Sequence, residues 1–131
     1  MTTASDVPIT AVALPLTSVP HVPSVAVIGL GRVGSVLSRA LHAVGYPIVA
    51  VASREPQKAA TAARMFGAQA LTPADAARHA DLVLLTVPDD VIPSLTRDLA
   101  AIGAWRKGQF VVHASGASPT DVLKPATEQG A

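Results

Sequence analysis

Val25-Ala-Val-Ile-Gly-Leu-Gly-Arg-Val-Gly-Ser35 is the stretch of this chain that decides its fold. Four apolar residues run into three glycines, Gly29, Gly31 and Gly34, in the spacing G-x-G-x-x-G. The apolar run predicts a buried strand over residues 25–28, and a helical pattern of apolar residues begins directly after it. A strand, a glycine turn and a helix N-terminus together form a site for a diphosphate, because free backbone N–H groups and the positive end of the helix dipole meet there.

Each glycine of this motif has an expected role. Gly29 permits a tight turn, Gly31 lets a diphosphate approach the backbone, and Gly34 lets the following helix pack closely on the strand. The alternative is a tight turn that binds nothing, because the spacing alone is a weak signal; its position between a strand and a helix favours the ligand. The loop residues expected to contact the ligand are Gly29, Leu30, Gly31, Arg32, Val33 and Gly34.

The chain around this motif alternates between predicted strands and helices. Strands are expected at residues 25–28, Ile48–Ala52, Ala68–Leu71, Asp81–Val87 and Gln109–His113. Helices are expected at Arg32–Val44, Pro56–Phe66, Pro73–His79, Asp89–Ile102 and from Ser118 onward. In the first helix, apolar residues recur at helical spacing and are expected to face the core: Val33, Val36, Leu37, Ala40, Leu41 and Val44. This order predicts an α/β fold with a doubly wound parallel sheet.

Length and composition bound the kind of protein. The 131 residues suit one dinucleotide-binding domain at 24–131, preceded by a proline-rich tail at 1–23 that is expected to be flexible. The chain has no cysteine and its four histidines lack i, i+4 pairing, which excludes disulfides and argues against a metal site. A net charge of +1 and 3% aromatic residues argue against nucleic acid as a partner. No apolar run is long enough to span a membrane and no secretory signal is evident, so a cytoplasmic location is expected.

Ser53 and Arg54, at the predicted tip of the second strand, decide which dinucleotide is expected. In NAD-binding sheets of this kind an acid stands there and binds the ribose 2′-hydroxyl. A hydroxyl and a guanidinium replace that acid here, and both are suited to a 2′-phosphate. The sequence therefore predicts NADP, with NAD the less favoured cofactor. In the alternative, Arg54 is a solvated loop residue, and Glu55 is a carboxylate that could reach the ribose.

The segment after the fourth strand is also expected to face the ligand, because ligands of doubly wound sheets bind beyond the carboxyl ends of the strands. Val87 and Pro88 are expected to contact the cofactor. Asp89 or Asp90 is expected to cap the next helix in preference to touching the ligand.

The segment His113-Ala-Ser115, which begins at the last residue of the predicted fifth strand, holds the weak candidates for catalysis. Ser115 is expected to hydrogen-bond the cofactor or a substrate, and His113 could exchange a proton near neutral pH. The alternative is that His113 is a strand residue bonded locally. The chain has neither the G-x-S-x-G of serine hydrolases nor the G-x-x-x-x-G-K-[ST] of P-loop ATPases.

Residues 24 to about 124 resemble the N-terminal domain of the Rossmann-like bacterial oxidoreductases, whose C-terminal half is a helical domain of unknown function. The resemblance rests on residues 27–34, 52–54, 85–90 and 113–116. The domain is similar, more distantly, to those of pyrroline-5-carboxylate reductase, the β-hydroxyacid dehydrogenases and the F420-dependent NADP reductases. The resemblance implies a Rossmann-like NAD(P)-binding fold, NADP binding and hydride transfer. Such relatives continue into a helical substrate and dimerisation domain, so we expect that this C-terminal domain is absent here, and that the partners are such a domain or a second copy.

Three hypotheses about function follow. The first is the NADP(H)-binding domain of an oxidoreductase that acts on an unidentified small molecule. The second is a dinucleotide-binding or sensing module without chemistry. The third, a methyltransferase-like or nucleotide-sugar sheet, predicts an acid at the tip of the second strand, and Ser53-Arg54 speaks against it.

Overall fold

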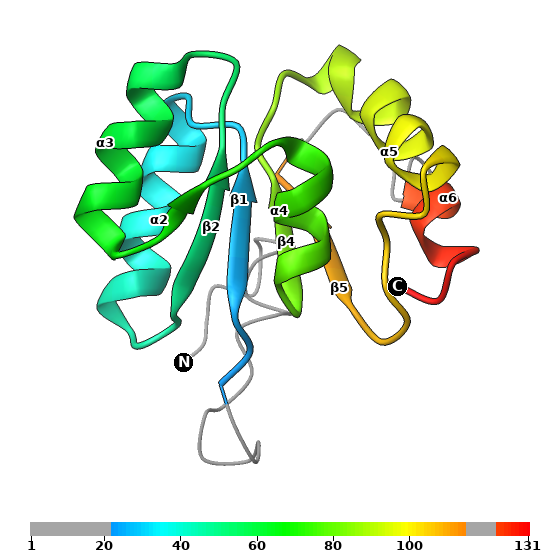
Figure 1. The fold of residues 1–131 in the computed structure, drawn as a ribbon, viewed down its shortest axis with the longest axis horizontal. Helices are drawn as coiled ribbons and strands as arrows, with labels where there is room; N and C mark the ends of the chain where they lie inside the picture. Colours follow the sequence, from blue (N-terminus) through cyan, green and yellow to red (C-terminus); the bar gives the residue numbers. More distant parts are fainter. Residues whose placement is uncertain (1–21, 115–122) are drawn as a thin grey trace.

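The computed structural model describes residues 22–114 and 123–131, and it confirms the α/β fold with a parallel sheet (Figure 1). The strands are β1 (Val25–Ile28), β2 (Ile48–Ala52), β3 (Gln69–Ala70), β4 (Leu82–Leu85) and β5 (Phe110–His113). The helices are α2 (Arg32–Ala43), α3 (Pro56–Phe66), α4 (Pro73–His79), α5 (Ile92–Ala101) and α6 (Lys124–Thr127). None of these described helices has the length and apolar character needed to cross a bilayer.

The sheet is doubly wound, with helices on both faces. Its strands lie in the order β3-β2-β1-β4-β5, and every pairing is parallel. Val25 and Val27 of β1 belong to the apolar cluster that includes residues of α2 and α3, whereas Ala26 and Ile28 belong to the cluster that includes residues of α4, α5 and α6. The chain changes face between β3 and β4, so the connections leave β1 and β4 in opposite directions. A crevice is expected where such neighbours end.

Two helices begin and end at the predicted residues because their boundary signals are local. Pro56 occupies the first turn of α3, where its missing N–H costs nothing, and Gly67 ends the helix in the left-handed conformation (φ +68°). The Thr72 hydroxyl caps α4 by accepting a hydrogen bond from the Asp75 N–H at 3.2 Å. The predicted bounds of α3 and α4 are therefore confirmed.

The predicted buried face of α2 is confirmed at Leu41, which is buried, and at Leu37, which packs against the core, but it is wrong at Val33, Val36, Ala40 and Val44, which are exposed. Gly34, Ser38 and Leu41 are the buried residues of this helix, while Val33, Val36 and Val44 are 52%, 57% and 59% exposed. The reason is the close approach of the helix to the glycine loop, which only a small residue at position 34 permits. The Ser38 hydroxyl donates to Gly34 O at 2.6 Å, so burying it leaves no unsatisfied donor.

The predicted aspartate cap after β4 is also wrong. Asp89 and Asp90 lie in a 3-10 turn, Asp89–Val91, that precedes α5, and neither carboxylate caps either element. The Val91 N–H already donates to Pro88 O at 2.9 Å, and Pro93 in the first turn of α5 sets the start of that helix. The predicted helix start at Ser118 lies outside the described residues.

Candidate functional site

The glycine loop is packed tightly between β4 and the start of α2. Gly29 has φ +103°, and a Cβ atom there would lie 2.7 Å from both the carbonyl carbon and the carbonyl oxygen of Thr86. A Cβ atom on Gly34 would lie 2.2 Å from Gly29 O. Real Cβ atoms do not approach backbone so closely, so these two glycines are required by packing.

Gly31 differs from the other two glycines, because a Cβ atom there would meet nothing within 4 Å. Gly31 is the N-cap of α2, in an extended conformation, and no side chain caps this helix end. Within the described residues, no backbone carbonyl accepts a hydrogen bond from the N–H of Leu30, Gly31, Arg32 or Val33. The open space at Gly31 thus adjoins unused backbone donors at the positive end of a twelve-residue helix.

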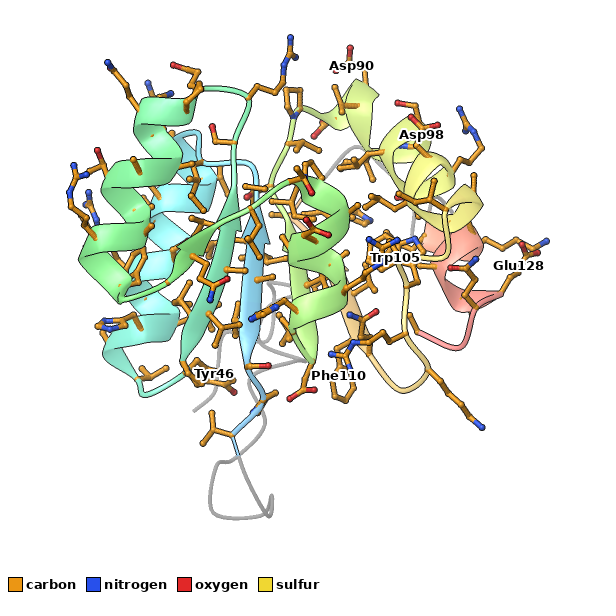
Figure 2. All side chains as sticks on the ribbon, in the orientation of Figure 1. Tyr46, Asp90, Asp98, Trp105, Phe110 and Glu128 are labelled. Carbon is orange, nitrogen blue, oxygen red and sulfur yellow. The ribbon has the colours of Figure 1, made fainter. Side chains whose placement is uncertain are left out.

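A cleft of about 860 Å³ opens in front of these donors. It lies at the carboxyl ends of β1, β2, β4 and β5, where the strand order reverses. The predicted site residues that line it are Gly29, Leu30, Gly31, Arg32, Val33, Ser53, Arg54, Val87 and Pro88. Gly34 is buried behind the loop, and Ser115 lies outside the described residues. Figure 2 places Asp90 at this edge of the molecule and Tyr46 and Phe110 at the opposite edge.

Cationic side chains gather at the β2 end of the cleft. Arg32, Arg54 and Lys58 line it, and Glu55 is the carboxylate among them. The Lys58 ammonium pairs with that carboxylate at 3.1 Å, and the Glu55 N–H donates to the Ser53 hydroxyl at 3.1 Å. The net charge of the side chains at this end of the cleft is positive, which favours the binding of an anionic group.

Small and apolar side chains line the other end of the cleft. Val87, Pro88, Val91, Leu95 and Ala114 come from the carboxyl ends of β4 and β5 and from the start of α5. Asp89 is the titratable side chain that accompanies them in the described lining. This end of the cleft is suited to a flat, weakly polar ring.

His113, a candidate for catalysis, does not line the cleft. It is the last residue of β5, beside Leu85 of β4, and it is 6% exposed. Its neighbour Ala114 reaches the cleft instead. No three histidine, aspartate or glutamate side chains of the described residues come together as a metal site.

Lys58 and Thr86 are among the lining residues that the sequence analysis did not predict. Lys58 lies in the first turn of α3, four residues after Arg54, and that spacing was a usable signal. Thr86 was assigned to the strand Asp81–Val87, but β4 ends at Leu85, and nothing in the local sequence distinguishes its hydroxyl.

Among the described residues, two side chains have a displaced pKa, and neither lines the cleft. Burial acts to raise the pKa of the Asp81 carboxyl, but hydrogen bonds from the Ser24 N–H and hydroxyl (3.3 Å each) and from Arg106 outweigh it, so that pKa is lowered. Burial raises the pKa of Tyr46. Asp81 precedes β4 and Tyr46 precedes β2, so both lie at the amino ends of the strands.

Several solved structures share this fold. A Bacteroides fragilis protein provisionally assigned as an NADP oxidoreductase is 26% identical, with a TM-score of 0.69 over 77% of this chain and 39% of its own. Imine reductase from Myxococcus stipitatus, in complex with NADP+, is 29% identical, with a TM-score of 0.68 over 82% and 38%. 3-Hydroxyisobutyrate dehydrogenase from Mycobacterium tuberculosis, with L-serine, is 25% identical, with a TM-score of 0.69 over 83% and 38%. The chain spans about two fifths of the length of these proteins.

Comparison with curated proteins gives no significant match. The profile of the Rossmann-like domain family, by contrast, matches residues 13–131, which is most of the chain. This match agrees with the doubly wound sheet and with the oxidoreductases among the similar structures. The chain belongs to the Rossmann-like domain family.

Proposed function

We propose that this chain is the NADP(H)-binding domain of an oxidoreductase. The observation that carries the proposal is the cleft in front of Gly31, where unused backbone donors at the start of α2 adjoin a cationic end of the same cavity. The diphosphate binds at the donors, and the adenosine half extends toward β2. The nicotinamide ring lies toward β4 and β5, against Val87 and Pro88.

Arg54 and Lys58 select the phosphorylated cofactor in this proposal. Both side chains line the cleft near Ser53, and the ion pair with Lys58 offsets the negative charge of Glu55, the nearest carboxylate, where a 2′-phosphate would bind. A charge-assisted hydrogen bond contributes about 1.5–3 kcal/mol, so one guanidinium accounts for a preference of about tenfold or more for NADPH over NADH. The imine reductase that resembles this chain was solved with NADP+, and a variant of it with NAD+, which supports a nicotinamide cofactor of either kind.

The reaction proposed is hydride transfer to or from a small-molecule substrate. The cofactor supplies or accepts the hydride when bound, and the residues of this chain bind it, orient its ring and cover one side of it. The oxidoreductases named above are about twice as long as this chain, so the substrate and its acid or base are expected to involve protein outside these 131 residues, either a helical domain or a second copy. A cytoplasmic setting suits such a function.

One observation favours a second candidate, a dinucleotide-binding module without chemistry. Asp89 is the titratable group in the described lining of the ring end, and the His113 imidazole is buried away from it. A sensing module needs no acid or base there. Both candidates predict cofactor binding, so they are distinguished by turnover of NADPH with carbonyl and imine substrates, measured on the chain together with the helical domain or second copy proposed above.

The test of cofactor choice is fluorescence titration with NADPH and NADH. Wild type is expected to bind NADPH about tenfold tighter or more, and Arg54→Ala is expected to lose that preference while its NADH affinity barely changes. Arg64→Ala is the matched control. Arg64 is exposed in the last turn of α3, the helix that follows Arg54, and it does not line the cleft. Equal affinities of wild type for the two cofactors would remove the role of Arg54.

A further inference from the structure

Thr86 lies at the point where the glycine loop, β4 and α2 meet. Its hydroxyl donates a hydrogen bond to Gly29 O at 2.6 Å, and its N–H donates to Ile28 O at 2.9 Å. The residue is half-buried and lines the cleft. Gly29 and Thr86 are 57 residues apart in the sequence, so this contact links two distant segments.

The Thr86 hydroxyl fits because Gly34 has no side chain. A Cβ atom on Gly34 would lie 2.5 Å from Thr86 Oγ1 as well as 2.2 Å from Gly29 O. The third glycine of the motif therefore leaves room for the hydroxyl and for the carbonyl that it holds. The hydrogen bond from Thr86 and the close packing of Gly34 together fix the direction of the Gly29 carbonyl.

The direction of that carbonyl determines the direction of the next amide. In a trans peptide, C=O and the following N–H point to opposite sides of the same plane. With Gly29 O turned toward Thr86 and Gly34, the Leu30 N–H is turned away from them, and Leu30 lines the cleft. This N–H makes no hydrogen bond to a backbone carbonyl of the described residues.

We propose that Thr86 is a positioning residue, whose hydroxyl holds the Gly29–Leu30 peptide so that the Leu30 N–H faces the diphosphate of the cofactor. The inference rests on the proposed function and adds a determinant outside the glycine motif. Without the hydroxyl, Gly29 O loses its donor and turns toward water in the cleft, because a buried carbonyl is costly to leave unpaired. The Leu30 N–H then rotates away from the phosphates.

The experiment compares Thr86→Val, which removes the hydroxyl at nearly constant shape, with Thr86→Ser, which keeps it. Two ligands are titrated: NADPH, and adenosine 2′-monophosphate, which carries the 2′-phosphate but no diphosphate. Thr86→Val is expected to bind NADPH at least about tenfold more weakly than wild type, and to bind adenosine 2′-monophosphate with the affinity of wild type. Thr86→Ser is expected to bind both within about twofold of wild type.

Thr96→Val is the matched control. Thr96 is buried in α5 and its hydroxyl donates to Ile92 O at 2.7 Å, so the same chemical change is made away from the cleft. It is expected to leave both affinities unchanged.

Four outcomes would overturn the inference. Unchanged NADPH affinity in Thr86→Val would show that the hydroxyl does not position the Gly29–Leu30 peptide for cofactor binding. Equal weakening of both ligands, or a tenfold loss in Thr86→Ser, would show damage to the cleft as a whole. If wild type bound no NADPH, the proposed function would fall and this inference with it, so the two failures are distinguishable.

Discussion

Gly31 and Gly34 lie three residues apart, but an added methyl group is expected to lower the stability of the protein at Gly34 and its affinity for NADPH at Gly31. At Gly34 the new carbon would lie 2.2 Å from Gly29 O and 2.5 Å from Thr86 Oγ1, two atoms that are hydrogen-bonded to each other and cannot move independently. Overpacking typically costs 1–3 kcal/mol, and two contacts this short place Gly34→Ala at about 3 kcal/mol or more. For a domain of this size the Tm falls by roughly 10 °C.

At Gly31 the methyl group meets no protein atom, and φ is −74°, which alanine adopts without strain. A weaker N-cap and a less flexible unfolded chain have opposite effects on the free energy of unfolding, so Gly31→Ala is expected to change it by less than about 1 kcal/mol. The methyl group occupies the space proposed for the diphosphate, and NADPH affinity is expected to fall about tenfold or more.

Urea denaturation measures stability through Trp105, the single tryptophan of the chain. Its ring is buried and its Nε1–H donates to Thr96 O at 3.2 Å, so its emission changes on unfolding. NADPH affinity is measured by titration of the same samples. A Gly34→Ala protein as stable as wild type would refute the packing argument, and a Gly31→Ala protein that binds NADPH normally would refute the assignment of the open space.

The remaining predictions concern stability away from the cleft. Because the folded pKa of Asp81 is below its unfolded value of about 3.9, its carboxylate adds stability above that pH that is lost as the pH falls through the folded pKa. Acid titration of unfolding is therefore expected to be slightly steeper below about pH 4 in wild type than in Asp81→Asn, and identical curves would contradict this. Val36→Thr is expected to change the free energy of unfolding by less than about 0.5 kcal/mol, whereas Leu41→Ala, on the buried side of α2, costs about 2–5 kcal/mol. If Val36→Thr lowered the free energy of unfolding by a large amount in the same urea denaturation, Val36 would belong to the buried face of α2, as the sequence predicts.

The parts of the fold that the sequence predicted well depend on local chemistry. Proline in the first turn, a left-handed glycine and a threonine cap define α3 and α4 within a few residues of chain, so their bounds were predictable. The apolar run before Gly29 is likewise enough for β1.

The parts that could not be predicted depend on contacts between distant segments. The orientation of α2 is set by the approach of Gly34 to Gly29 and Thr86, and apolar periodicity carries no information about that contact. The sequence placed His113 at the correct strand end, but its burial beneath the cleft depends on how β5 packs beside β4. Gly29, Gly31, Ser53 and Arg54 were identifiable as cleft residues because each lies within three residues after the end of a predicted strand, whereas Thr86 was expected within a strand.

The hydrogen bond between Thr86 and Gly29 also has a consequence for folding. The loop that holds the diphosphate in our proposal acquires its final shape only when β4, synthesised more than fifty residues later, has paired with β1. Competence to bind is then gained with the long-range step of folding, which is the slow kind because the intervening chain must first be closed into a loop. A nascent or partly unfolded chain is therefore unable to capture the cofactor, and a bound cofactor stabilises the junction of β1 with β4 by mass action. Substitutions that weaken this junction anywhere in the sheet will lower the fraction of competent molecules without altering the intrinsic affinity of those that remain folded.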